Sequence, residues 1–117
     1  MKNKISIIVK LKVEGIHRWK ECNIDEVSFL RNTHRHVFYI TCKKKVSHQD
    51  RDIEVIKFKR QIQSYLFSKY GMPCDFKEMS CEMIAFNIFQ EFKLISCEVL
   101  EDGENGAEVT NENLERY

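Results

Sequence analysis

Apolar residues alternate with mostly polar ones near the start of the chain, at Ile5, Ile7, Val9, Leu11 and Val13. This period of two is typical of a β-strand with one buried and one solvent-facing side. Continuing the alternation places Gly15 and His17 on the buried side. A second alternating run over residues 34–42 places His34 and His36 together on one side. The pattern therefore predicts two strands that carry histidines.

Two later segments show helical spacing instead. Apolar residues between positions 56 and 69 recur at intervals of three and four, and Tyr70-Gly71 followed by Pro73 predicts where this helix ends. Ser80 is suited to the N-cap of a second helix, with an apolar stripe that continues to Phe92. The segment between the two strands has no sustained period, so we expect a loop with one helical turn near residues 25–30.

The remaining segments predict shorter elements. "DIEVI" is expected to form a short strand before the first helix, and Ile95, Cys97 and Val99 alternate along a later strand that Glu101 continues. A closing strand is expected at residues 107–109. The predicted order is β-β-(β)-α-α-β-(β). It describes an α+β domain over residues 1–109, with about four antiparallel strands, two helices on one face and a disordered acidic tail over 110–117.

Composition narrows the class of protein. The chain has 117 residues, 43% of them hydrophobic and 32% charged, which is typical of one globular domain. The formal net charge is +1, so the chain lacks the overall excess of positive charge that is typical of nucleic-acid-binding proteins. We find no apolar run long enough for a membrane span and no secretory signal. The 5 cysteines form no CxxC pair, so we expect reduced thiols and a cytoplasmic protein.

Three histidines are expected to meet at one corner of the sheet. If the first two strands are antiparallel neighbours, the end carrying His17 lies beside the start carrying His34 and His36. Three imidazoles with an open fourth position form the ligand set of catalytic zinc sites. An HxH pair is also common among surface and packing residues, and a carboxylate such as Glu101 at a strand end is commonly only solvated.

The chain resembles the 6-pyruvoyltetrahydropterin and 6-carboxytetrahydropterin synthase family, which has the tunnelling fold. The matching segments are "VEGIHRW", His34-Arg35-His36, "IEVIKFKRQI", "MSCEMIAFNIF" and "CEVLEDGENGAEV", in that order. The resemblance implies that His17, His34 and His36 bind zinc and that Glu101 anchors a pterin or a related heterocycle. It also implies a ring-shaped homo-oligomer with sites at the subunit interfaces.

The chain departs from the family pattern where the acid–base chemistry should be. Leu30 stands where the family has its catalytic cysteine, four residues before the paired histidines. The stretch "SKYGMPCDFKEMS" contains Asp75 but no histidine, although the family has an Asp-His pair there. Arg35 replaces the glycine between the paired histidines, which would narrow the site or add a cation for a phosphate.

Other residues are candidates for the missing roles. Cys22, His48 and Glu26 are possible substitute bases, although each is more commonly a buried spacer or a solvated residue. Trp19 is a candidate for stacking on a planar ligand, with ordinary packing as the alternative, and Arg35 is a candidate ligand-binding residue.

Three functions follow from these residues. The first is a zinc-binding protein that holds a pterin, deazapurine or purine-like molecule, with the standard lyase chemistry altered or lost. The second is an active zinc-dependent carbon–oxygen lyase with a nonstandard base. The third is a ligand-sequestering or sensing protein, of the kind that some viruses encode.

Overall fold

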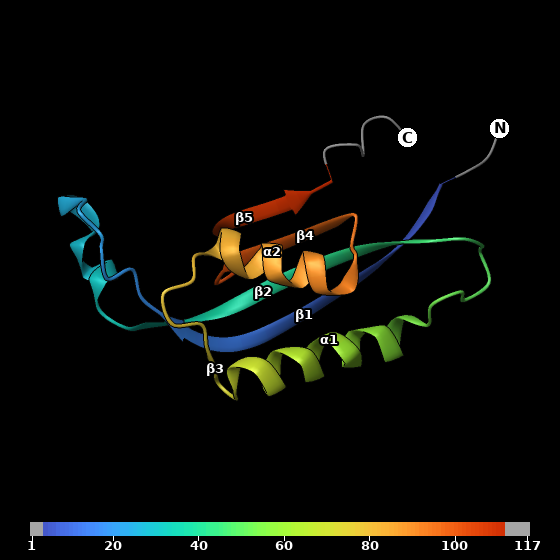
Figure 1. Cartoon of the computed structure of the whole chain (residues 1–117), viewed down its shortest axis with the longest axis horizontal. Helices are drawn as coiled ribbons and strands as arrows, with labels where there is room; N and C mark the ends of the chain where they lie inside the picture. The colour runs from blue at the N-terminus through green and yellow to red at the C-terminus, as the bar shows by residue number, and fades with distance from the viewer. Residues whose placement is uncertain (1–3, 112–117) are drawn as a thin grey trace.

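A computed structural model describes residues 4–111 of the chain. It is an α+β structure with two α-helices packed on a five-stranded sheet and one 3-10 helix in a connection beyond the sheet, as predicted at the level of fold class (Figure 1). The elements in chain order are β1 (Ile5–His17), η1 (Asp25–Arg31), β2 (His34–Val46), α1 (Val55–Tyr70), β3 (Cys74–Asp75), α2 (Cys81–Phe92), β4 (Ser96–Glu101) and β5 (Asn105–Thr110).

The sheet has the strand order β3-β1-β2-β4-β5. All neighbouring pairs are antiparallel except β1 and β3, which are parallel. The long β1–β2 ladder begins with Ile5 opposite Val46 and ends with His17 opposite His34. The two predicted histidine-bearing strands are therefore adjacent and antiparallel, and their histidine ends coincide.

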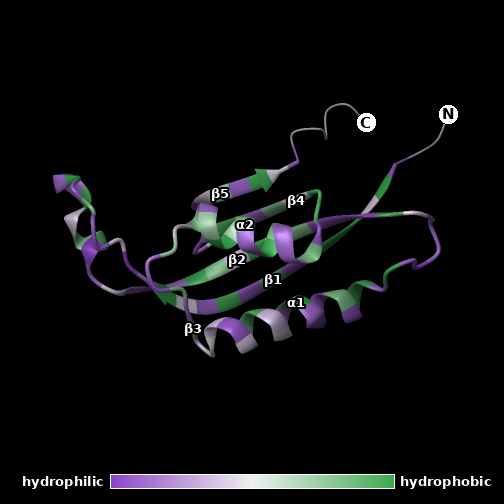
Figure 2. Cartoon of the chain, in the orientation of Figure 1, coloured by the Kyte–Doolittle hydropathy of each residue, from purple (hydrophilic) through white to green (hydrophobic). Residues whose placement is uncertain are grey.

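Both α-helices cover the same face of the sheet and enclose one core (Figure 1). Alternation along β1 is visible as alternating hydrophobic and hydrophilic positions (Figure 2), and it buries Val9, Leu11 and Val13 beneath the helices. The core continues through β2 and β4 and through one side of each helix, at Phe38, Ile40, Cys42, Phe58, Ile62, Leu66, Ile84, Ala85, Ile88, Cys97 and Val99.

The helix ends follow local chemistry. The carboxylate of Glu54 accepts hydrogen bonds from the amides of Ile56 and Lys57, and α1 ends at Gly71, whose φ of 91° suits glycine. Ser80 caps α2 by accepting a hydrogen bond from the amide of Met83, as predicted. This cap fixes the segment that leads into α2. The same segment borders the histidine end of the sheet.

Three predicted details differ from the structure. The short strand expected at "DIEVI" is wrong, because Glu54 caps α1 there and Ile53 packs against the core as part of a loop. A two-residue strand, β3, lies between the helices where none was predicted. The closing strand extends from Asn105 to Thr110, beyond the expected residues 107–109.

The expected helical turn near residues 25–30 corresponds to η1, in a connection that projects from the histidine end of the sheet (Figure 1). The predicted disordered tail lies, from residue 112 onward, outside the described residues. Among the described residues, no helix is long and apolar enough to cross a membrane.

Candidate metal centre

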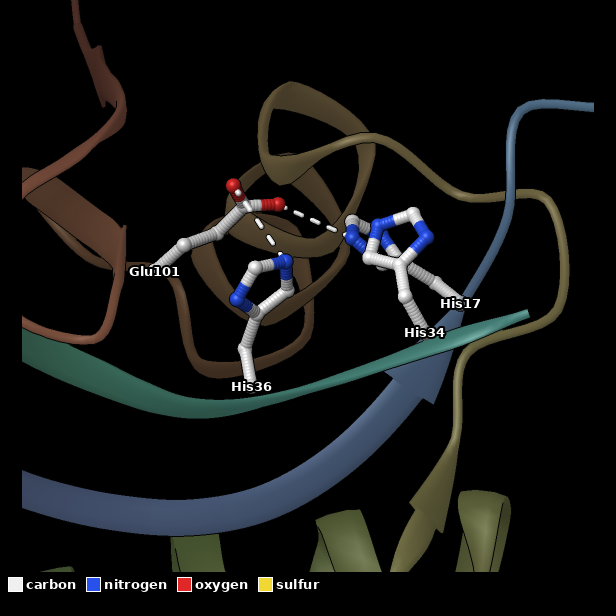
Figure 3. A group of neighbouring side chains, drawn as sticks. All are labelled: His17, His34, His36 and Glu101. Atoms are coloured by element: carbon white, nitrogen blue, oxygen red, sulfur yellow. Dashed lines mark ion pairs between the residues drawn. The ribbon is translucent and has the colours of Figure 1, made fainter. Parts of the chain in front are cut away.

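The imidazoles of His17, His34 and His36 gather where β1 ends and β2 begins (Figure 3). Their ring centroids lie 4.6 Å apart for His17 and His34, 5.0 Å for His34 and His36, and 5.4 Å for His17 and His36. The register explains this arrangement, because His17 pairs with His34 while His36 pairs with Gly15, which has no side chain to intervene. Strand pairing alone therefore brings the three rings together.

The Nδ1 atom of each ring is held by an oxygen that can only accept a hydrogen bond. His17 Nδ1 donates to the carbonyl of Met79 at 2.9 Å, and His34 Nδ1 donates to the carbonyl of Asn32 at 2.8 Å. His36 Nδ1 donates to a carboxylate oxygen of Asp102 at 2.7 Å. A neutral imidazole with its proton on Nδ1 has a lone pair on Nε2. The three contacts therefore select the form of each ring that can bind a metal through Nε2.

The Nε2 atoms of all three rings are buried and make no hydrogen bond within residues 4–111. Buried polar atoms in folded proteins normally make hydrogen bonds, so three Nε2 atoms in one place that make none require an explanation. A cation that takes all three lone pairs would satisfy them. Histidine nitrogen is a preferred ligand of zinc and of several other transition metals.

Glu101, the last residue of β4, completes the group. Its Oε2 lies 2.9 Å from Nε2 of His17 and its Oε1 lies 3.6 Å from Nε2 of His36, both within ion-pair distance (Figure 3). Contact with His17, and then the charge of His36, lower the pKa of Glu101 against the effect of burial. Burial lowers the pKa of His17, but contacts with Glu101 and Met79 outweigh it, and the net shift is upward.

These four side chains could hold a metal ion. One donor atom from each of His17, His34, His36 and Glu101 lies within 4.8 Å of every other. Donor atoms around a tetrahedral zinc ion lie roughly 3.3–3.5 Å apart, so a modest contraction would accommodate one. Three nitrogens and one carboxylate oxygen also form a chemically suitable donor set for zinc. The residues present therefore fit such an ion.

A cleft of about 560 Å³ opens beside this group and is lined by three of its members, His17, His34 and Glu101. Trp19 and Leu30 line it from the connection between β1 and β2. Met79 lines it from the segment before α2, and Cys81 and Met83 line it from the first turn of α2. Burial, followed by the nearby charge of Glu101, raises the pKa of the Cys81 thiol to about 12. The cleft thus joins a largely apolar wall to the polar group formed by the histidines and Glu101.

The other sequence candidates occupy different places. Trp19 lines the cleft and is 43% exposed. Arg35 pairs with Glu14 on the face of the ladder opposite the histidines. Cys22 is buried in the connection between the strands, where its thiol faces backbone carbonyls, and Glu26 is exposed on η1.

His48 follows the far end of β2, next to Asp52. Within β2, residues 37–46 separate it from His36, a length of roughly 33 Å. Within one chain, the structure therefore brings Trp19 to the histidine centre and leaves Cys22, Glu26, Arg35 and His48 outside it.

Sequence reasoning missed the groups that hold the rings. Asp102 binds His36, and the carbonyls of Asn32 and Met79 bind the other two histidines. Every residue has a carbonyl, so sequence contains no signal for these two. Asp102 had a weak signal, because it directly follows Glu101 and precedes a glycine, as turn aspartates often do.

Comparison of the chain with protein-family models and with curated proteins finds no match.

Proposed function

We propose that this chain binds a zinc ion through His17, His34 and His36 and holds a pterin, deazapurine or purine-like molecule in the adjoining cleft. The observation that carries the proposal is the set of three buried Nε2 atoms that converge on Glu101 and make no hydrogen bond within the described residues, each on a ring whose Nδ1 is already bound. A centre built only for packing would not need three rings oriented in the same way.

Glu101 supports the ligand class. Its carboxylate lines the cleft and lies next to the candidate metal ligands. Two parallel N–H groups on the edge of an aminopyrimidinone ring match the two oxygens of a carboxylate, and such paired, charge-assisted hydrogen bonds are strong and selective. The apolar wall that includes Trp19 and Leu30 would pack against the flat faces of the ring.

The standard lyase chemistry of the family that the chain resembles is altered or lost in this proposal. A bound zinc would polarise an oxygen of the ligand, but proton transfer also needs a positioned base. Leu30 contributes an inert side chain to the cleft wall. The substitute bases Cys22, Glu26 and His48 do not line this cleft, so an active lyase would need a base from elsewhere, such as a neighbouring chain. A role in sequestering or sensing the ligand needs no base.

We also propose that the chain forms a homo-oligomer in the cytoplasm. Strands β3 and β5 lie at the two edges of the sheet, and proteins commonly cover open edges with another chain. All 5 cysteines are free thiols, which fits a reducing compartment.

Metal analysis of the purified protein tests the centre. We expect stoichiometric zinc in the wild type and a large loss in His34→Ala. His48→Ala is the matched control, because it removes a histidine at the other end of β2 and should retain zinc. Equal zinc content in the wild type and His34→Ala, or a wild type that binds no zinc, would remove the metal from the proposal.

Ligand binding is tested on the zinc-loaded protein with guanine and with a pterin, by titration calorimetry. Glu101→Gln should abolish binding, whereas Glu78→Gln, which changes another carboxylate of the same cleft, should not. If neither compound binds, the proposed ligand class is wrong. Conversion of dihydroneopterin triphosphate by the wild type would instead establish the active lyase.

A further inference from the structure

The turn between β4 and β5 places a second carboxylate next to the histidines. Asp102 directly follows Glu101, and its φ of 56° lies in the left-handed region, which aspartate tolerates better than most residues. Its amide donates to the carbonyl of Val37 at 2.7 Å, and its Oδ1 accepts from the amide of Val37 at 3.0 Å. Two hydrogen bonds to β2 therefore fix both the backbone and the side chain of Asp102.

The other carboxylate oxygen, Oδ2, accepts the hydrogen bond from Nδ1 of His36 at 2.7 Å. His17 and His34 bind uncharged backbone carbonyls in the same way. Of the three histidines, His36 is thus the one whose Nδ1 partner is a charged side chain. A carboxylate in this position fixes the tautomer and orientation of the ring and makes its other nitrogen more basic.

We propose that Asp102 is a positioning residue that keeps the proton of His36 on Nδ1 and presents its Nε2 lone pair to the metal. This inference rests on the proposed function as far as the metal is concerned. The tautomer itself is a property of the protein without metal, so it can be tested separately.

The two oxygens of Asp102 have different partners, which makes asparagine an informative substitution. In Asp102→Asn, the amide oxygen can keep the hydrogen bond from the Val37 amide, and the NH2 group then faces Nδ1 of His36. An NH2 group can only donate, so Nδ1 must become the acceptor and the ring proton must move to Nε2. The nitrogen that faces the other ligands would then carry a proton and could not bind a metal.

Asp102→Ala has a different consequence. Alanine removes both hydrogen bonds of the side chain and leaves Nδ1 of His36 facing solvent, where either tautomer is available. Alanine is also less suited than asparagine to a positive φ. A purely structural role for Asp102 therefore predicts that alanine is the more damaging substitution, whereas a role in setting the tautomer predicts that asparagine weakens metal binding more.

The first measurement is nitrogen-15 NMR of the histidine rings in metal-free protein, at an alkaline pH where the imidazoles are neutral. We expect His36 to carry its proton on Nδ1 in the wild type and on Nε2 in Asp102→Asn. Asp75→Asn is the matched control, because Asp75 accepts a hydrogen bond from a turn amide but binds no histidine. The same His36 tautomer in the wild type and in Asp102→Asn would overturn the inference.

The second measurement is zinc affinity by competition with a chelator. Loss of a carboxylate that orients a ligating histidine weakens binding by about 10–100-fold, so we expect at least this loss in Asp102→Asn, a smaller loss in Asp102→Ala and none in Asp75→Asn. Weaker zinc binding in Asp102→Ala than in Asp102→Asn, or an unchanged zinc affinity in both variants, would contradict the assigned role. If the wild type binds no zinc, the proposed function fails, and the NMR experiment still decides the role of Asp102.

Discussion

Gly15 lies in β1 where the core meets the histidine centre, and we expect Gly15→Ala to destabilise the protein. A Cβ atom at this position would lie 2.8 Å from Cε2 of Phe76, and 2.9 and 3.0 Å from two ring carbons of Phe38. Carbon atoms in contact are normally about 3.5–4.0 Å apart. The rings would therefore have to move by roughly 0.5–1 Å.

Neither ring has room for this movement. Phe38 and Phe76 are both 0% exposed, and their centroids lie 4.9 Å apart in an edge-to-face contact. Overpacking of such an interior costs about 1–3 kcal/mol. For a domain of this size, each kcal/mol lowers the melting temperature by about 3–6 °C. The expected loss is therefore about 3–18 °C, measured by circular dichroism on metal-free protein.

A double-mutant cycle shows whether the clash is the cause. Leucine at position 76 is smaller than phenylalanine and leaves space beside Gly15, so Gly15→Ala should cost less in a Phe76→Leu background than in the wild type. An unchanged melting temperature in Gly15→Ala, or the same loss in both backgrounds, would refute this reasoning. The Phe38 ring also packs in edge-to-face contacts with the rings of His17 and His36, with centroids 5.3 and 5.7 Å away. We therefore expect weaker zinc binding in Gly15→Ala.

Three further predictions concern metal removal and the helix caps. Removing zinc from protein saturated at about 100 times its dissociation constant should lower stability by about 2.7 kcal/mol, seen as a lower melting temperature after chelation; no shift would contradict a metal bound to the folded state. Ser80→Ala should cost about 1 kcal/mol in chemical denaturation, because the amide of Met83 loses its acceptor; an unchanged midpoint would exclude the cap. Hydrogen bonds from the amides of Ile56 and Lys57 lower the pKa of Glu54. The ionised Glu54 therefore stabilises the fold above the ordinary pKa of glutamate, and this contribution is lost as the pH falls through the lowered pKa of the folded state. Glu54→Gln should lower the melting temperature at neutral pH but not in strong acid.

The elements that could be predicted from sequence are those in which a regular pattern of apolar residues continues over many positions or a capping residue marks the end. Alternation from Ile5 to His17 identified the first strand and its buried face, and the cap at Ser80 identified the start of α2. Short elements have no such signal. The two residues of β3 form a strand only because the chain between the helices lies against the edge of β1. "DIEVI" has strand-like composition, but Glu54 binds the first amides of α1 instead.

In the candidate site, too, one part could be predicted from the sequence and another could not. Convergence of His17, His34 and His36 follows from period and strand pairing, which are properties of the pattern. The contacts that orient the rings depend on where turns and loops return to the sheet, as at Asp102 and Met79. Such contacts depend on backbone placement, so sequence reasoning missed them.

The β1–β2 ladder has a consequence for how the chain folds. His17 and His34 are the last pair of a long antiparallel ladder that starts with Ile5 opposite Val46. Sliding one strand past the other by a single residue would reverse which side chains share a face, and the three imidazoles would no longer meet. A bound ion would therefore stabilise only the correctly aligned hairpin. Metal uptake during refolding should report the moment at which that alignment is reached.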